Sequence, residues 1–152
     1  MEIETFDLFR QIIEEKIPFN KLIGVKVHAL EAGTCALYLP FRHELIGDVN
    51  RMTLHGGVLS MLIATCGSFA VWSICSPEDK IVTIDMGIDY LRPVPGTDLI
   101  AEARIRYVGS RVGNAHTVIY PFGEQDNILA EGRSVYSIRR KDVTSESLSN
   151  NS

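Results

Sequence analysis

The sequence predicts an α+β fold in which a curved antiparallel sheet wraps around one long helix. Three observations favour this class. The stretch 54–74 is the only long apolar run with helical spacing, two short β-rich runs precede it, and several longer β-rich runs follow it. The chain has 152 residues, of which 45% are hydrophobic and 22% are charged, which suits one domain with a sizeable core. We expect this domain to span residues 1–140.

The first element expected is an amphipathic helix over about residues 5–17, lying over an edge of the fold. Its apolar side chains recur at helical spacing among acidic and polar residues (Phe6, Phe9, Ile12 and Ile13). Pro18 is expected to end this helix. Strands are then expected near 24–30 and 34–40, because two β-rich runs are separated by a short segment with Gly33, which predicts a hairpin.

Residues 42–53 have mixed polarity and are expected to form the loop that leads into the central helix. The helix itself, at 54–74, is apolar almost all round and carries no charged side chain, so it should be buried on most faces. A membrane span is a poor interpretation, because glycines, serines and a threonine dilute the run and no cationic flank adjoins it.

Two glycines, Gly56 and Gly57, stand at the start of this helix. The first N–H groups of a helix have no partner within it, and the helix dipole is positive there, so an oxyanion or carbonyl oxygen could bind. The alternative is that the two glycines only let the chain turn tightly into the helix.

After the helix, apolar and polar residues alternate over 80–93, and three further β-rich runs follow at 99–108, 112–122 and 128–138. Short turns between four successive strands predict an antiparallel meander. Such a sheet leaves edges that a partner subunit would cover, so a homo-oligomer is expected. Residues 141–152 are polar and serine-rich and are expected to form a disordered tail.

Composition narrows the function classes. A formal net charge of −4 argues against binding to nucleic acid or to an anionic membrane. The three cysteines lack CxxC spacing and are interpreted as buried thiols in a reducing cytosol. No metal site is expected, because His28, His43 and His116 lack the spacing of metal ligands. The acidic N-terminus lacks the features of a secretory signal, and a cytoplasmic location is therefore the expectation.

Several motifs occur in an order that is typical of one family. LHGGV at 54–58 opens the apolar helix and follows PFRHELIGD at 40–48; TIDMGIDYLRPVPG at 83–96, YVGSRVG at 107–113 and AEGRSVYSI at 130–138 come after it. Over roughly 22–138 the chain resembles hotdog-fold thioesterases of the phenylacetyl-CoA thioesterase (PaaI-like) type. The resemblance implies a dimer or tetramer of hotdog subunits with acyl-CoA sites at the subunit interfaces, and no cofactor beyond the coenzyme A of substrate or product.

The resemblance also implies roles for individual residues. The backbone N–H of Gly56 would polarise the thioester carbonyl, with Gly57 beside it, and His55 would support the start of the helix. The substrate-binding residues expected are Asp48, Asn50, Leu54, Thr65, Asp85, Arg106, Gly109, Ser110 and Arg111. The arginines near the YVGSRVG turn could meet the phosphates of coenzyme A, or they could simply belong to a solvated strand face; Arg92 and Arg104 are open to the same two interpretations.

The chain departs from the family at one position. Most relatives carry an Asp or Glu nine residues after the histidine, as general base or nucleophile, and here that residue is Ala64. Either a natural lineage has lost or relocated the base, or the substitution is an engineered one. Candidates for a replacement are Asp48 and Glu44 in the loop, Asp85 and Asp89 on the following strand, and the hydroxyls of Thr65 and Thr83.

The leading functional hypothesis is an acyl-CoA thioesterase that hydrolyses an acyl or aroyl thioester, weak or inactive because of Ala64. The alternative is a non-catalytic protein that binds acyl-CoA or another acyl ligand on the same scaffold. A third hypothesis is a structural oligomer whose pocket is filled by side chains.

Overall fold

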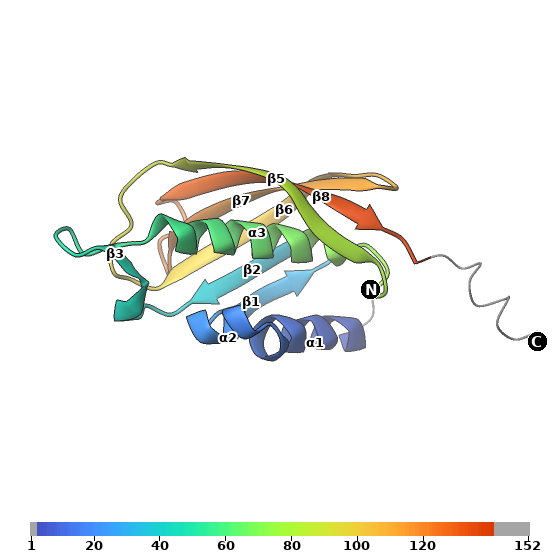
Figure 1. Cartoon of the computed structure of the whole chain (residues 1–152), viewed down its shortest axis with the longest axis horizontal. Coiled ribbons are helices and arrows are strands. Elements are labelled where there is room, and N and C mark those ends of the chain that lie inside the picture. The colour runs from blue at the N-terminus through green and yellow to red at the C-terminus, as the bar shows by residue number, and fades with distance from the viewer. Residues whose placement is uncertain (1–2, 142–152) are drawn as a thin grey trace, which may run out of the picture.

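The computed structural model describes residues 3–141 and confirms the predicted architecture. A six-stranded antiparallel sheet in the order β1-β2-β6-β7-β8-β5 curls around α3, as Figure 1 shows. The strands are β1 (Lys26–Glu31), β2 (Thr34–Leu39), β5 (Lys80–Tyr90), β6 (Leu99–Val108), β7 (Val112–Pro121) and β8 (Ala130–Arg139), and α3 spans Gly56–Trp72. This is the hotdog arrangement, a sheet wrapped around one central helix.

Helix α3 buries one side against the concave face of the sheet. Its large apolar side chains there, including Leu62, Ile63 and Phe69, are at most 3% exposed and form the centre of the core. The expectation that the helix is buried on most faces is only half right, because a strip spaced three and four residues apart stays accessible. That strip comprises Gly57, Ser60, Met61, Ala64, Thr65 and Ser68.

The N-terminal segment is helical and ends just before Pro18, as predicted, but a second helix that was not predicted follows at once. Helix α1 (Ile3–Gln11) continues through a π-helical turn at Ile12–Lys16, and Pro18 then begins a second helix, α2 (Pro18–Ile23). Proline suits the first position of a helix, because the N–H it lacks would have no partner there. Gly24, with φ of 91°, ends α2 in the left-handed conformation.

These helices cover the outer edge of β1, as expected (Figure 1). The Glu14 carboxylate accepts a hydrogen bond from the Val27 N–H at 2.9 Å, and the Arg10 guanidinium donates to the Val27 carbonyl at 3.3 Å. The N–H and the carbonyl of Val27 on this edge are thereby satisfied. The opposite edge strand, β5, has a neighbour on one side only.

The region expected to be a plain loop contains structure of its own. A 3₁₀ turn at His43–Leu45 leads into a small antiparallel ladder of β3 (Ile46–Asp48) and β4 (Thr53–Leu54). The ladder holds the chain just before α3, and such short pairings leave little trace in a periodicity pattern.

The predicted four-strand meander is also partly wrong. Strands β6, β7 and β8 are consecutive neighbours, but β5 pairs with β8 at the far edge and β6 pairs with β2. The connection 91–98 therefore crosses the end of the sheet beneath the start of α3, where the Leu54 N–H donates to the Val94 carbonyl at 2.9 Å. Eight residues can span about 25 Å, which is ample for passing two strands.

The predicted disordered tail falls on residues 142–152, outside the described residues. Within residues 3–141, none of the helices has the length and apolar character needed to span a membrane.

Candidate active site

The start of α3 is capped by the residue that precedes it. His55 is extended, with φ of −63° and ψ of 131°, and its Nδ1 accepts a hydrogen bond from the Gly57 N–H at 2.8 Å. Its carbonyl accepts the N–H of Val58 at 3.0 Å. Because Nδ1 is the acceptor, the neutral imidazole carries its proton on Nε2. The proposed supporting role of His55 therefore has a concrete geometry.

This cap leaves one donor open. Within the described part of the chain, the Gly56 N–H has no hydrogen-bond acceptor, whereas the N–H groups of Gly57 and Val58 are both occupied. The positive end of the helix dipole adds to the attraction for a negative oxygen at this point. The two glycines thus have different roles: Gly56 provides the free N–H donor, whereas the N–H of Gly57 is used by the His55 cap.

The loops around His55 leave no room for larger side chains. A Cβ on Gly47 would lie 2.6 Å from the Cα of His55, so only glycine allows β3 to pass so close to the residue. The His55 N–H donates to the Leu45 carbonyl at 2.9 Å, which fixes the backbone on its other side. The helix start is held by main-chain bonds from two loops.

Gly56 and Gly57 open into a cavity of about 580 Å³. Its apolar lining includes Leu54, Leu59 and Val94, and the connection 91–98 forms one wall. Two guanidinium groups, Arg51 and Arg92, also line it. An apolar interior with cations and an open N–H suits a ligand that has an acyl chain, a carbonyl and anionic groups.

The side chain of Arg92 is partly fixed. It donates to Asn127 Oδ1 at 2.8 Å, and its backbone N–H donates to the Leu129 carbonyl at 3.1 Å. Of the arginines considered from the sequence, Arg92 is the one that lines the cavity together with Gly56. Arg51 was not considered, since nothing in a mixed-polarity loop distinguishes it.

Two hydroxyl groups also meet at the start of α3. The hydroxyls of Tyr90 and Ser60 each donate to the Gly56 carbonyl at 3.2 Å and lie 3.1 Å from each other. Neither residue was predicted for the site. Tyr90 is the last residue of β5 and comes to Gly56 only through the fold.

Ala64 lies two turns further along the helix, on the accessible strip and next to Thr65. At about 1.5 Å per residue, it is about 12 Å along the axis from Gly56. Its carbonyl accepts a hydrogen bond from the Tyr136 hydroxyl at 2.8 Å. Burial raises the pKa of Tyr136, so this hydroxyl remains a neutral donor that pins the helix to the sheet at this position.

The loop candidates do not point at Gly56. Both bonds of Asp48 Oδ1 are local, accepting the N–H groups of Asn50 at 2.9 Å and Arg51 at 3.2 Å, as in an Asx turn. Asn50 and Glu44 are exposed. Asp48 thus shapes the loop that carries Arg51 to the cavity.

The strand candidates divide between the two faces of the sheet. Thr83 pairs with Tyr136 and lies on the helix side, whereas a bulge after Thr83 puts Asp85 opposite Val135, on the outer face. Asp89 is also on the outer face and lines a separate hollow with His116 and Arg133. Within one chain, neither Asp85 nor Asp89 can therefore act at the open donor.

The predicted phosphate-binding group lies at the other end of the molecule. Gly109, Ser110 and Arg111 form the β6–β7 turn near the end of α3, and Arg106 precedes them on β6. Arg140 clasps this turn by donating to the carbonyls of Gly109 and Ser110, both at 3.1 Å. In a single chain these residues are separated from Gly56 by the length of α3, about 24 Å.

The Arg140 guanidinium also reaches Asp79 at 3.0 Å. Burial opposes ionisation of this carboxyl, but N–H groups of Lys141 and Ser76 and the guanidinium together lower the pKa of Asp79. The clasp places the β6–β7 turn beside residue 80, where β5 begins.

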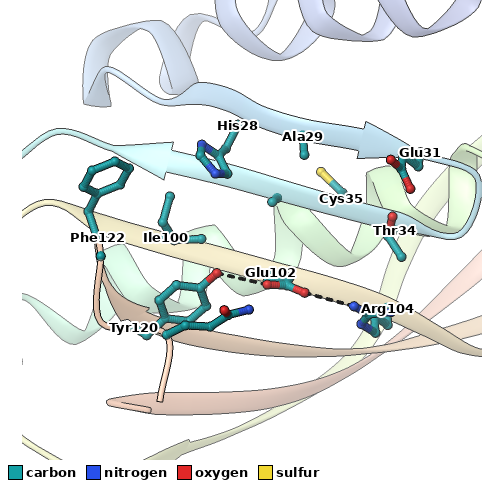
Figure 2. A pocket seen from close by; sticks show the side chains of 13 residues that line it. His28, Ala29, Glu31, Thr34, Cys35, Ile100, Glu102, Arg104, Tyr120 and Phe122 are labelled. Atoms are coloured by element: carbon teal, nitrogen blue, oxygen red, sulfur yellow. Dashed lines mark hydrogen bonds and ion pairs between the residues drawn. The ribbon is translucent and has the colours of Figure 1, made fainter. Parts of the chain in front are cut away.

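A second cavity, of about 560 Å³, lies on the outer face of the sheet (Figure 2). Of its two acidic residues, Glu31 and Glu102, the second is already engaged, accepting from the Tyr120 hydroxyl at 3.0 Å and pairing with Arg104 at 3.3 Å. Burial, with Glu102 beside the hydroxyl, raises the pKa of Tyr120 to about 12. No helix begins at this cavity, so it lacks the open donor found at Gly56.

The three cysteines are free and buried, as predicted. The Cys66 thiol donates to the carbonyls of Cys35 at 3.0 Å and Ala101 at 3.3 Å, and burial raises its pKa well above the ordinary value. A thiol held in this way is a structural group. Across residues 3–141, no three His, Cys, Asp or Glu side chains gather as a metal site would require.

Comparison with known proteins adds a family to this geometry. The family described as the Thioesterase superfamily matches residues 52–125, which include the capped start of α3 and the connection 91–98. A Halobacterium salinarum protein, named as a candidate esterase, is 36% identical over 132 residues that cover 79% of this chain and 83% of that protein. The chain belongs to the thioesterase superfamily. By family it is a thioester hydrolase.

Three further proteins resemble the chain at lower sequence identity. The Escherichia coli protein YigI, named a medium/long-chain acyl-CoA thioesterase, is 25% identical over 89% of this chain and 94% of its own length. A candidate thioesterase from Syntrophus aciditrophicus has a solved structure with a TM-score of 0.74 and 30% identity, covering 87% of this chain and 94% of that one. The Haemophilus influenzae thioesterase HI1161, 20% identical with a TM-score of 0.77 over 91% of this chain and 93% of that one, shares the fold.

Proposed function

We propose that this chain binds acyl-CoA thioesters and hydrolyses them, with the Gly56 N–H as the oxyanion donor. The observation that carries the proposal is the open Gly56 N–H at a cavity whose lining combines apolar side chains with the guanidinium groups of Arg51 and Arg92. The acyl-CoA activity named for YigI supports this substrate class. Coenzyme A enters as part of the substrate or product, and no other cofactor is proposed.

In the proposed reaction, water adds to the carbonyl carbon, and negative charge develops on the carbonyl oxygen next to the Gly56 N–H. One well-placed donor of this kind is commonly worth about 10²- to 10³-fold in rate. The C–S bond then breaks, and coenzyme A leaves as a thiolate. A general base should take a proton from the water, and Ala64 offers none, so the rate of the natural chain should be low.

One chain does not complete such a site. A carbonyl bound at Gly56 is about 12 Å from residue 64, which exceeds the reach of any carboxylate side chain placed there. We therefore propose that the site lies between two copies and that residue 64 faces the Gly56 of the partner copy. The accessible strip on α3, which includes Ala64, supports this arrangement.

The free edge of β5 supports the same dimer. Val82 and Ile84 on this strand are 49% and 58% exposed. Antiparallel pairing of two β5 strands about a two-fold axis would place Tyr90 of one copy beside Lys80 of the other. The turn held by Arg140 lies at the Lys80 end. Arg106, Ser110 and Arg111 would then approach the cavity of the partner copy, as their proposed phosphate-binding role requires.

A proline substitution tests the donor. Gly56→Pro removes the N–H, and the extended backbone of His55 is the conformation that a residue before proline adopts, so the fold should tolerate it. Gly56→Ala is the matched control, because it keeps the N–H and its Cβ would lie 3.4 Å from Tyr90. We expect the proline variant alone to lose affinity for acyl-CoA analogues and any residual turnover. Equal affinity and rate in the two folded variants would refute the donor assignment.

A non-catalytic acyl-CoA-binding protein is the second candidate, favoured by the methyl group of Ala64. Turnover of a panel of arylacetyl, medium-chain and long-chain thioesters, followed with a thiol-reactive dye, separates the two. Binding by calorimetry without turnover would favour the second candidate. The same panel tests the phenylacetyl-CoA type, and sedimentation tests whether dimers pair further into tetramers. We also propose a cytoplasmic location, which fractionation would check.

A further inference from the structure

We propose that Tyr90 and Ser60 are positioning residues that aim the Gly56 N–H at the substrate carbonyl. The inference rests on the proposed function and assigns a role to two side chains that the sequence did not bring to the site. Their hydroxyl groups hold the Gly56 carbonyl, each at 3.2 Å, and come from different elements, the end of β5 and the second turn of α3.

The three oxygens form a closed triangle. The two hydroxyls lie 3.1 Å apart, and either of them can donate to the other. In every arrangement of the two protons that uses these contacts, at least one hydroxyl still donates to the Gly56 carbonyl. The carbonyl is therefore held whether or not the hydroxyls also bond to each other.

The held carbonyl belongs to the same peptide group as the Gly57 N–H, which donates to His55 Nδ1 at 2.8 Å. The peptide between Gly56 and Gly57 is thus fixed at both ends, by hydroxyls on its oxygen and by imidazole on its nitrogen. Hydrogen bonds joined through one peptide group polarise each other, so each end strengthens the other. The result is a chain from Tyr90 and Ser60 through the peptide to His55. The Gly56 N–H belongs to the preceding peptide group, and it is oriented through the Gly56 Cα, which the two peptide groups share.

Two adjacent glycines need such a restraint. Glycine has more backbone freedom than any other residue, so a helix that begins with two of them would start loosely. An oxyanion donor is effective only when it is already aimed before the charge develops. The side chains of Tyr90, Ser60 and His55 supply the order that the glycines cannot.

The position of Tyr90 argues against a role in packing alone. The residue is 55% exposed, yet its hydroxyl points back to the Gly56 carbonyl. A Cβ built on Gly56 would lie 3.4 Å from both Cε1 and the hydroxyl oxygen, so the ring edge lies over the first residue of the helix. The polar contact, and not buried area, is what connects Tyr90 to the site.

The test uses the full chain and two probes, measured by calorimetry. One probe is an acyl-CoA analogue with the thioester sulfur replaced by CH₂, which keeps the carbonyl; the other is an alkyl-CoA thioether, which has none. Tyr90→Phe and Ser60→Ala should each weaken binding of the ketone by about 3- to 10-fold, the effect of one neutral hydrogen bond, and leave the thioether within about 2-fold. Tyr120→Phe, at a tyrosine whose hydroxyl donates to Glu102 on the outer face of the sheet, is the control and should change neither.

Equal losses of affinity for the two probes would mean that Tyr90 and Ser60 only shape the cavity. Unchanged affinity for both probes would mean that the two residues do not orient the Gly56 N–H. Either result overturns the proposal. Hydrogen exchange of the Gly57 amide gives a second readout that needs no ligand. In the Tyr90→Phe/Ser60→Ala double variant this amide should exchange faster, and unchanged exchange would also overturn the proposal. If the natural chain binds ketone and thioether equally, the Gly56 donor assignment fails, while the exchange measurement still decides whether the hydroxyls hold the peptide.

Discussion

Ala64→Asp should install thioesterase activity, because the donor and the cavity are already in place. A general base is commonly worth about 10²- to 10⁴-fold, so we expect turnover of at least one acyl-CoA to rise by at least about 100-fold. Ala64 is part of the accessible strip and in the proposed dimer faces the cavity of the partner copy, so the new carboxylate enters a cavity and not the packed core, which limits its desolvation cost. The helix itself loses about 0.7 kcal/mol from the poorer propensity of aspartate.

The assay follows release of coenzyme A with a thiol-reactive dye across a panel of acyl groups. Ala64→Asn is the matched control, since it has almost the same shape but cannot accept a proton at neutral pH. Thermal unfolding should show a loss of only about 1–3 °C for either variant. A folded Ala64→Asp variant that binds coenzyme A thioesters but turns none of them over faster than Ala64→Asn would refute the missing-base argument.

Subunit mixing tests directly whether donor and base come from different copies, as the separation of about 12 Å between residues 56 and 64 within one chain requires. A chain with both Gly56→Pro and Ala64→Asp has the base without the donor, while the natural chain has the donor without the base. Free exchange of an equal mixture should make about a quarter of all sites complete if each site takes its donor and base from different copies. If donor and base came from the same chain, no complete site would form and the mixture would stay inactive.

Three further substitutions test the surroundings of the site. Gly57→Ala places a Cβ 2.8 Å from His55 Nδ1, so the ring must move; the lost cap should cost about 1 kcal/mol in the free energy of unfolding, measured with urea. Gly67→Ala drives a methyl into the Tyr136 hydroxyl, and overpacking should cost about 1–3 kcal/mol, with partial rescue by adding Tyr136→Phe. The Phe41 N–H and the Tyr38 hydroxyl donate to Asp98 and lower its pKa. The Asp98 carboxylate therefore stabilises the fold fully at pH values above its ordinary pKa of about 3.9. This stabilisation is lost as the pH falls through the lowered pKa. Asp98→Asn should therefore lower the melting temperature at pH 7, and its difference from the unsubstituted chain should shrink as the pH falls through the lowered pKa; a difference that stays constant down into acid would contradict the assignment.

Local patterns predicted the elements well. The apolar run of α3 and the alternation in β5 each follow from side-chain periodicity, and the bounds of β6 agree at both ends. The helix end before Pro18 was predicted, but the second helix that begins at Pro18 was not, because proline fits the first position of a helix as well as the residue after its end. The small ladder of β3 and β4 was missed since two or three residues carry no period.

Such patterns did not predict which strands are neighbours, nor that Tyr90 lies at Gly56. Alternation tells which face a side chain occupies, but not which strand lies beside it, so β5 was placed next to β6 when it pairs with β8. Gly56 was predicted because helix starts have a chemistry that depends on local sequence alone. Tyr90 was not, because its contact with Gly56 spans 34 residues and exists only once β5 has reached the edge of the sheet.

The position of β5 explains why donor, cavity and proposed dimer belong together. With β5 at the far edge, residues 91–98 must cross beneath α3 to reach β6, and that crossing forms a wall of the cavity at Gly56. The same placement carries the Tyr90 hydroxyl to the Gly56 carbonyl and leaves the outer side of β5 without a neighbour. Had β5 paired with β6 as predicted, the 91–98 segment would be a tight hairpin and the helix start would lack that wall. The free edge and the open donor are thus two consequences of one strand order, and a variant that blocks β5 pairing, such as Ile84→Lys, should abolish the activity gained by Ala64→Asp while leaving the monomer folded.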